Sequence, residues 1–166
     1  MHHVHNRPGG AVGWAELQTT DVPKAERFDR WLDLLSQDLA PTHIASEHRG
    51  DFRASTAALE LGPVNVSVLS FPTLTSVRTP QLIRRSDPEL WELGYMARGT
   101  VVVEQARNQA QIRPGDFLLY DTSQPTQMWV TEGGRIIISS VASREVVYGF
   151  HPFRGFRPGS GCRLRT

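Results

Sequence analysis

The alternation of short apolar runs with turn residues constrains the fold of this chain more than any other feature. After about residue 52 the sequence changes to alternating or β-branched runs, separated by turns such as Gly62-Pro63, Pro114-Gly115 and Gly133-Gly134. This texture predicts about eight or nine short strands joined by hairpin-length loops. An open sheet of that many strands would leave unpaired edges. We therefore expect a mainly β domain whose sheet closes or doubles over.

One amphipathic helix is expected before the strands, from Asp21 to Ala40. Its apolar residues recur at helical spacing, which places them on one face of the helix. These residues are Phe28, Trp31, Leu32, Leu35 and Leu39. Pro23 suits the first turn of such a helix, and Pro41 ends it because the residue before a proline is pushed out of the helical region.

The composition fits one folded domain with two atypical ends. A length of 166 residues and a hydrophobic fraction of 39% are enough for a single core. We predict a flexible N-terminal arm over residues 1–20, the folded domain over 21–145 and a basic Gly/Arg/Pro-rich tail over 146–166. The net charge of +1 hides an asymmetry, because residues 149–166 hold four arginines and no acid. The other residues carry 14 basic and 17 acidic groups, or −3.

Several segments and sites are not expected. No apolar run is long enough to span a membrane, and the N-terminus lacks the apolar core of a signal peptide. The lone Cys162 excludes an intramolecular disulfide, so we expect a cytoplasmic protein. His43 and His48 lie before the first predicted strand and His151 after the last, which makes isolated polar residues the favoured interpretation over a metal site. We expect no metal and no cofactor.

No catalytic residue is singled out by the acidic side chains. Asp116 and Asp121 belong to predicted turns, where a carboxylate accepts backbone N–H bonds. Glu92 and Glu104 occupy strand positions, and we expect both side chains to point outward. A structural role is therefore favoured over acid–base catalysis for all four residues.

The stretch from Gly99 to Pro125 carries the most specific pattern. It predicts a strand, a short turn and a short strand, then a Pro114-Gly115-Asp116 turn and a further strand that stops before Pro125. Together with Val77-Arg78-Thr79 and the helix end at Leu39-Ala40-Pro41, this stretch resembles the N-terminal sensor domain of AraC-type transcriptional regulators. The resemblance covers roughly residues 24–141. It implies a cupin or jelly-roll-like double-sheet barrel with an N-terminal helix, which binds a small-molecule effector and dimerises.

Regulators of this type normally carry two helix-turn-helix units after the sensor domain. Residues 142–166 show no helical apolar period that could form a recognition helix, so direct DNA binding is not expected from this chain alone. The predicted partners are an effector and a second copy, or a full-length relative in a heterodimer. The tail has three alternative interpretations: the end of a truncated or frame-shifted regulator, a vestigial linker, or a segment whose interspersed arginine and aromatic residues weakly contact nucleic acid. The alternative function is a stand-alone cupin-fold enzyme acting on a small metabolite.

Strand alternation supplies the candidate ligand contacts. Trp91, Leu93 and Tyr95 share one face, as do Val101, Val103 and Gln105, with Met128 or Trp129 opposite. An apolar and aromatic lining with a few polar groups is typical of small-molecule sites. The predicted ligand-binding residues are therefore Trp91, Tyr95, Val103, Gln105, Trp129 and Arg78.

Each candidate also has a structural interpretation. The three aromatic residues could be core or interface residues, and Arg78 could pair with an Asp or Glu of the domain instead of a ligand carboxylate. Phe28, Trp31 and Leu35 of the helix are predicted to mediate dimerisation, with packing on the barrel as the alternative.

Overall fold

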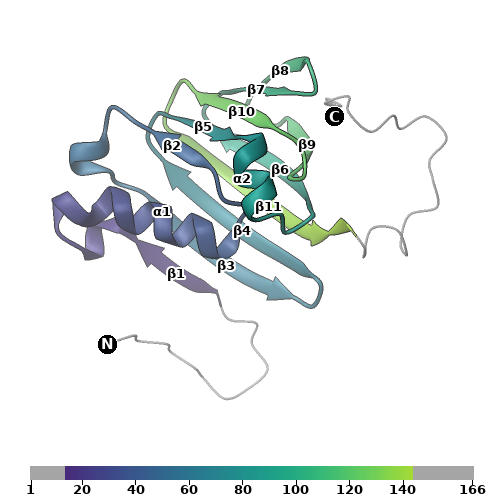
Figure 1. Ribbon diagram of the computed structural model, residues 1–166. Coiled ribbons are helices and arrows are strands. Elements are labelled where there is room, and N and C mark those ends of the chain that lie inside the picture. The colour runs from purple at the N-terminus through teal and green to yellow at the C-terminus, as the bar shows by residue number, and fades with distance from the viewer. Residues whose placement is uncertain (1–13, 144–166) are drawn as a thin grey trace.

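Two antiparallel sheets face each other in the computed structural model, which describes residues 14–143 (Figure 1). Sheet A has six strands in the order β1-β3-β4-β11-β6-β9, and sheet B has five in the order β2-β5-β10-β7-β8. The strands are β1 (Ala15–Gln18), β2 (His43–Ala45), β3 (Ser55–Leu61), β4 (Val64–Phe71), β5 (Leu74–Arg78), β6 (Leu90–Arg98), β7 (Val101–Gln105), β8 (Asn108–Ile112), β9 (Phe117–Asp121), β10 (Thr126–Val130) and β11 (Gly134–Ala142).

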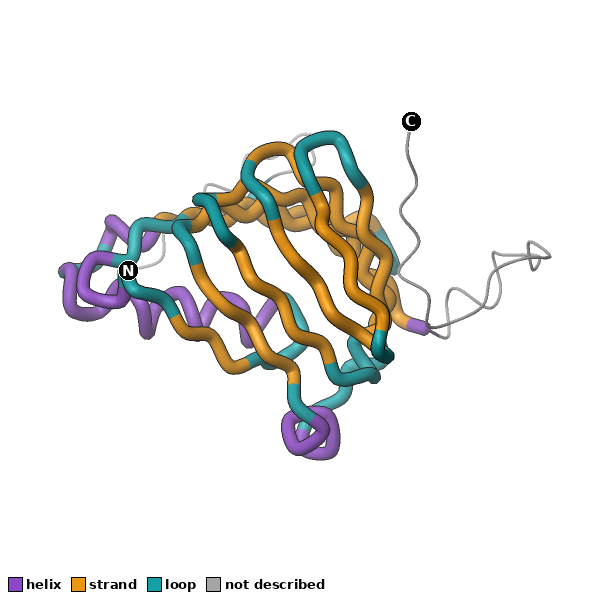
Figure 2. Tube along the Cα trace, turned by 90° about the horizontal axis from the view of Figure 1, so that it is seen from above, coloured by secondary structure: helices purple, strands orange, loops and turns teal. Residues whose placement is uncertain are grey.

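The predicted jelly-roll-like double sheet with a leading helix is confirmed. The two sheets stay separate and do not close into a barrel (Figure 2). Residues 14–143 form eleven strands instead of the predicted eight or nine, because β1 and β2 lie in segments that carry no β pattern in the sequence.

The helix is shorter than the sequence predicts. Two 3-10 turns, Thr19–Asp21 and Lys24–Glu26, precede α1 (Arg27–Asp38). Pro23 has an extended conformation, with ψ of 149°, so regular α-helix starts only after it. The chain leaves the helix at Leu39, which is also extended and whose N–H still bonds the Leu35 carbonyl at 2.9 Å.

A second helix, α2 (Pro80–Arg85), has no counterpart among the predicted elements. It starts at Pro80, and the Thr79 hydroxyl oxygen accepts a hydrogen bond from the Leu82 N–H at 3.2 Å. Thr79 therefore acts as its N-cap. Six residues are too few to display a helical apolar period, which is why the periodicity did not indicate this helix. Within residues 14–143 neither helix is long and apolar enough to cross a membrane.

The prediction of a flexible arm is wrong from residue 15 onward. Residues Ala15–Gln18 form β1 and pair with β3, and the side chain of Thr19 is completely buried. The Thr19 hydroxyl donates to the Phe52 carbonyl at 2.7 Å and accepts from the Ala54 N–H at 2.8 Å. These bonds tie the N-terminal strand to the start of β3. Residues 1–13 and the predicted tail from residue 146 lie outside the described residues.

The core lies between the sheets and under α1, which crosses the β1-β3-β4 end of sheet A (Figure 1). Trp31 of α1 contacts the rings of Phe52 and Phe71, with centroid distances of 5.8 and 6.0 Å. Burial of such large side chains is the main favourable contribution to folding. The helix thus closes the end of the sandwich that sheet B does not cover.

The predicted Pro-Gly-Asp turn is confirmed and fixes the end of β6. Gly115 has a φ of +91°, a conformation that favours glycine. The Asp116 carboxylate accepts a hydrogen bond from the Arg113 N–H at 3.0 Å, as the turn chemistry predicts. The Gly115 N–H donates to the Met96 carbonyl at 2.9 Å, which places the turn directly beside β6. This strand also carries Glu92.

Candidate functional site

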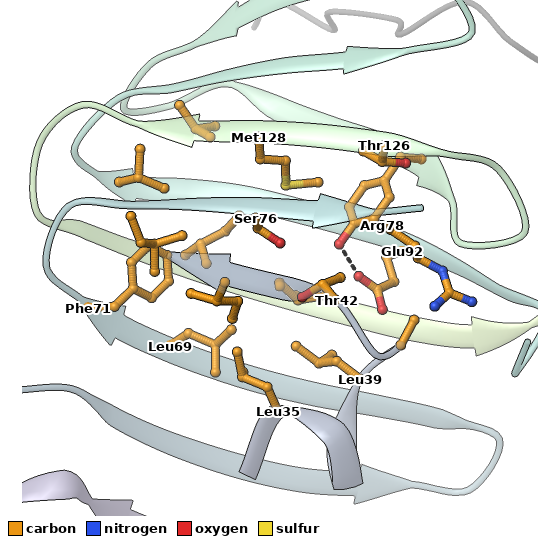
Figure 3. Close-up of a pocket in the computed structure, with 18 of the residues that line it drawn as sticks. Leu35, Leu39, Thr42, Leu69, Phe71, Ser76, Arg78, Glu92, Thr126 and Met128 are labelled. Atoms are coloured by element: carbon orange, nitrogen blue, oxygen red, sulfur yellow. Dashed lines mark hydrogen bonds between the residues drawn. The ribbon is translucent and has the colours of Figure 1, made fainter. Parts of the chain in front are cut away.

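A cavity of about 110 Å³ lies between the inner faces of the two sheets, beside α1 (Figure 3). Both sheets and the helix contribute side chains to its walls, and most of these are apolar. The apolar lining includes Trp31, Leu35, Leu39, Leu69, Phe71, Met96, Leu118, Met128, Ile136 and Ile138. Empty, apolar interior space of this size is unusual, because cores normally pack as densely as organic crystals.

Polar side chains gather at one end of the cavity, and Glu92 of β6 is central among them (Figure 3). Glu92 is 2% exposed and lies opposite Tyr120 of β9 in the register of sheet A. The Tyr120 hydroxyl donates a hydrogen bond to Glu92 Oε2. Glu92 Oε1 makes no hydrogen bond with any described residue. A buried carboxylate oxygen without a partner is rare and calls for an explanation.

Burial raises the pKa of the Glu92 carboxyl, because the charged form loses its hydration. The hydrogen bond from Tyr120, the positive charge of Arg78 and the backbone N–H of Ala40 act in the opposite direction. The dipole of the Ala40 N–H group stabilises the charged form of Glu92, although this group does not meet the geometric criteria for a hydrogen bond to Oε1. Burial likewise raises the pKa of Tyr120 well above its usual range, and the Glu92 carboxylate adds to this effect. Tyr120 therefore stays protonated and acts as a donor.

Arg78 of β5 joins four parts of the chain at the same end of the cavity. Its Nε donates to the Thr122 carbonyl at 2.6 Å, Nη1 to the Pro41 carbonyl at 2.7 Å and Nη2 to the Ser86 carbonyl at 2.9 Å. Nη2 also lies 3.6 Å from Asp87 Oδ1. The guanidinium thus holds the α1–β2 connection, the residue after α2 and the end of β9 against sheet B. Arg78 is oriented by backbone carbonyls and is a structural centre of the site.

The sequence of residues 31–146 matches the family of AraC-binding-like domains. The chain belongs to this family. Its fold is also that of the AraC-like transcriptional activator CuxR, whose crystal structure superposes with a TM-score of 0.71 at 17% identity. That superposition covers 82% of this chain and 49% of CuxR.

Two curated relatives resemble this AraC-binding-like domain in sequence. The transcriptional activator NphR of Rhodococcus sp. is 27% identical over 110 residues, which are 66% of this chain and 33% of NphR. An uncharacterised protein in the nit 5'region of Bacillus sp. (strain OxB-1) is 26% identical over 111 residues, or 66% of this chain and 42% of that protein. The chain thus covers less than half the length of each of these relatives. The matches support a regulatory ligand-binding domain.

Three predicted ligand contacts of the AraC-binding-like domain lie away from the cavity. Trp91 and Tyr95 project from the outer face of β6, because Glu92, Gly94 and Met96 are the buried residues of that strand. Trp129 lies on the outer face of β10, whose inner residues include the cavity-lining Met128. The predicted inward face of β6 was wrong, and so was the outward orientation expected for Glu92. Glu104, in contrast, is exposed as predicted.

The remaining three predicted contacts lie inside the sandwich. Arg78 lines the cavity. Val103 belongs to the buried core cluster and is not among the residues that line the cavity. Gln105 accepts a hydrogen bond from the Asp121 N–H at 3.3 Å and donates to the Asp121 carbonyl at 2.8 Å, so it connects β7 to β9. A ligand contact by Gln105 or Val103 stays a prediction.

The helix residues predicted to mediate dimerisation face the interior. Phe28 and Trp31 are 3% and 1% exposed, and both belong to the core cluster. Trp31 and Leu35 line the cavity, and the Trp31 Nε1–H finds no hydrogen-bond acceptor in the described part of the chain. These side chains pack on the sheets because the helix supplies the missing wall of the sandwich. A dimer contact through Phe28 or Trp31 is excluded by this burial.

Sheet A has a second apolar surface on the side that faces away from the cavity. We call it the outer apolar face; it consists of Val64, Val66, Val68, Trp91, Leu93, Tyr95, Phe117, Leu119, Ile137 and Val141. Leu93 near its centre is 39% exposed, and the rings of Tyr95 and Phe117 lie 5.0 Å apart. Trp91 and Tyr95, two of the three aromatic residues predicted to contact a ligand, thus belong to the outer apolar face.

The two histidines that the structure describes lie apart from the cavity. His43 and His48 are exposed, and His151 lies outside the described residues. Among residues 14–143 no group of three or more His, Cys, Asp or Glu side chains is arranged to hold a metal ion.

Proposed function

We propose that this AraC-binding-like domain binds a small-molecule effector in the cavity between its sheets. One observation carries the proposal: an apolar cavity ends at Glu92, a buried carboxylate with one unpartnered oxygen. Small-molecule sites are concave and mostly apolar, with a few polar groups that orient the ligand. A ligand that donates to Glu92 Oε1 would supply the partner that the described residues do not provide.

Effector binding would act on transcription through α1 and its connection to β2. The cavity is lined by Trp31, Leu35 and Leu39 of the helix, and the following Pro41 carbonyl is held by Arg78. A bound molecule therefore contacts the helix and both sheets at once, so that it favours one arrangement of these parts over others. In a transcriptional activator that also carries DNA-binding units, this preference would reach those units; NphR and CuxR, which this chain resembles, are transcriptional activators. We also propose that the protein is cytoplasmic.

A cavity-filling variant tests this function. Ser76 lines the cavity, whereas its neighbour Thr75 lies on the opposite face of β5. We expect Ser76→Leu to fill most of the cavity and to abolish the binding of any small molecule found by native mass spectrometry of a metabolite library. Thr75→Leu adds a similar apolar volume outside and should leave that binding unchanged. Binding that persists in Ser76→Leu at wild-type affinity would place the effector elsewhere.

The same experiment separates an effector domain from the alternative, a stand-alone cupin-fold enzyme. A regulator releases its effector chemically unchanged, whereas an enzyme converts it. We expect the molecule recovered after prolonged incubation with the protein to have its original mass. A product that accumulates with time in wild type, and not in Ser76→Leu, would establish the enzymatic alternative.

We further propose that the domain forms a dimer through the outer apolar face. Four neighbouring strands about 4.8 Å apart give this face a projected area of roughly 300 Å². The largest apolar patch on a typical monomer measures about 300–600 Å² and is often functional, so this face lies at the lower end of that range. A second copy presents the same apolar face, and a two-fold axis would pair the two.

A charge on the outer apolar face should abolish such a dimer. We expect Leu93→Lys to shift the molecular mass measured by light scattering from that of a dimer to that of a monomer. Glu104→Lys adds the same side chain to exposed surface of sheet B and should leave the dimer intact. A wild-type protein that is monomeric at high micromolar concentration would refute this part of the proposal.

A further inference from the structure

The polar end of the cavity offers one carboxylate oxygen that no described residue satisfies. Glu92 Oε2 already accepts the Tyr120 hydroxyl, and Oε1 accepts nothing from the described residues. In the ionised form, Glu92 Oε1 can only accept, so the group that completes this site then carries an O–H or N–H. The chemistry of the unpaired atom therefore restricts the ligand.

The charges at this end restrict it further. The buried Glu92 carboxylate is accompanied by the buried guanidinium of Arg78, so the negative and the positive charge offset each other. Asp87, which does not line the cavity, lies 3.6 Å from Arg78 Nη2. Three nitrogens of Arg78 are committed to backbone carbonyls, so Arg78 is poorly placed to receive a ligand carboxylate. A charged ligand would lose its hydration and disturb this balance.

The volume and the lining restrict the body of the ligand. An apolar cavity of about 150 Å³ holds benzene. The cavity here, at about 110 Å³, is of the same order, which limits its ligand to about one small ring. The walls include the rings of Trp31 and Phe71 and the sulfur atoms of Met96 and Met128. Thioether sulfur and ring edges make favourable contacts with an aromatic ring.

We propose that the site takes a small uncharged molecule, with a single apolar ring and one hydroxyl or N–H group that donates to Glu92 Oε1. This inference rests on the proposed function and specifies its ligand class. Tyr120 acts as a positioning residue, because its hydrogen bond to Oε2 turns the other oxygen toward the cavity (Figure 3).

Four probes of matched shape test this class by calorimetric titration of the full chain. Benzyl alcohol is neutral and donates, toluene has no polar group, benzoate is an anion and benzylammonium a cation. A hydrogen bond to a charged acceptor corresponds to roughly tenfold or more in affinity, so we expect benzyl alcohol to bind at least about tenfold more tightly than toluene. Both charged probes should bind more weakly than benzyl alcohol.

A conservative variant gives a sharper test because it reverses the polarity of the unpaired atom. In Glu92→Gln the amide oxygen can accept the Tyr120 hydroxyl, which turns the amide N–H₂ toward the cavity. We expect this variant to lose the preference for benzyl alcohol over toluene and to prefer benzaldehyde, which accepts a hydrogen bond. Glu104→Gln on the exposed face of β7 should keep the wild-type order of affinities.

Equal affinity for benzyl alcohol and toluene, or tightest binding of a charged probe, would overturn the ligand class. Failure of all four probes to bind the wild-type protein would also overturn it. The proposed function fails on a different result, which is binding of a library compound that Ser76→Leu does not reduce. The two failures are therefore distinguishable.

Discussion

Replacing Glu92 with glutamine should make the protein more stable at neutral pH, and by an amount that depends on pH. Burial raises the pKa of the Glu92 carboxyl above its ordinary value of 4.5. A group whose folded-state pKa is raised contributes stability that is fully present below the unfolded-state value. That contribution is lost as the pH rises through the folded-state pKa. Glutamine does not titrate, so the difference between the two proteins should grow from about pH 4.5 upward.

The magnitude follows from what the substitution keeps and removes. Glutamine keeps an acceptor for Tyr120 and removes the cost of a buried charge. Each unit by which the folded-state pKa is raised corresponds to about 1.4 kcal/mol at a pH well above it. One amide N–H₂ without a partner offsets part of this gain, and we expect the net difference to favour the glutamine variant at pH 8. For a chain of this length, each kcal/mol of net stabilisation corresponds to roughly 2–4 °C in melting temperature.

Urea denaturation at half-unit steps from pH 4.5 to 8 measures this difference directly. Glu104→Gln serves as the control, because Glu104 is exposed and the same change there removes no buried charge. A Glu92→Gln variant that is less stable than wild type at pH 8, or whose difference from wild type is constant with pH, would refute the reasoning. Either result would show that the surroundings of Glu92 stabilise its charged form.

Three further substitutions have defined outcomes. Arg78→Lys cannot bond three carbonyls at once, and we expect a loss of about 2–4 kcal/mol in the free energy of unfolding measured with urea. Thr19→Val leaves two buried backbone groups unpaired and should cost about 1–3 kcal/mol, whereas Thr19→Ser should restore most of the melting temperature. Gly99→Ala would place a Cβ 2.9 Å from the Gly133 carbonyl oxygen. In the control Gly115→Ala, φ is also positive but the space around the Cβ is open. The loss of stability in Gly99→Ala should therefore clearly exceed that in Gly115→Ala. Equal losses for Gly99→Ala and Gly115→Ala would contradict that geometry.

The positions of strands and turns were largely predictable from the sequence because turn chemistry is local. Gly62 and Gly115 both have positive φ in the structure, and both were identified from Gly-Pro and Pro-Gly pairs. The strands that the sequence did not indicate, β1 and β2, are short edge strands. Their pairing is decided by β3 and β5, which lie far along the chain.

The direction in which each strand faces was not predictable from alternation. Val64, Val66 and Val68 share one face of β4, and the neighbouring Ser67 and Leu69 are the ones that turn inward. Sheet A is apolar on both faces in this region, so an apolar alternation fits either orientation. Only the contact with the other sheet distinguishes the inner face from the outer one.

Glu92 was missed for a related reason. Carboxylates are rarely fully buried, so a glutamate within a strand is normally assigned to the solvent face. Its partner Tyr120 lies 28 residues away and becomes its neighbour only through the register of β6 and β9. The contributions of Trp31 and Leu35 to the cavity likewise depend on how α1 crosses the sheets.

A crystal structure of the chain soaked with benzyl alcohol tests the central claim most directly. The account predicts one molecule between the two sheets, with its hydroxyl oxygen about 2.6–3.0 Å from Glu92 Oε1 and its ring against Phe71 and Met128. An empty cavity, with the ligand bound only on the outer apolar face, would contradict the account.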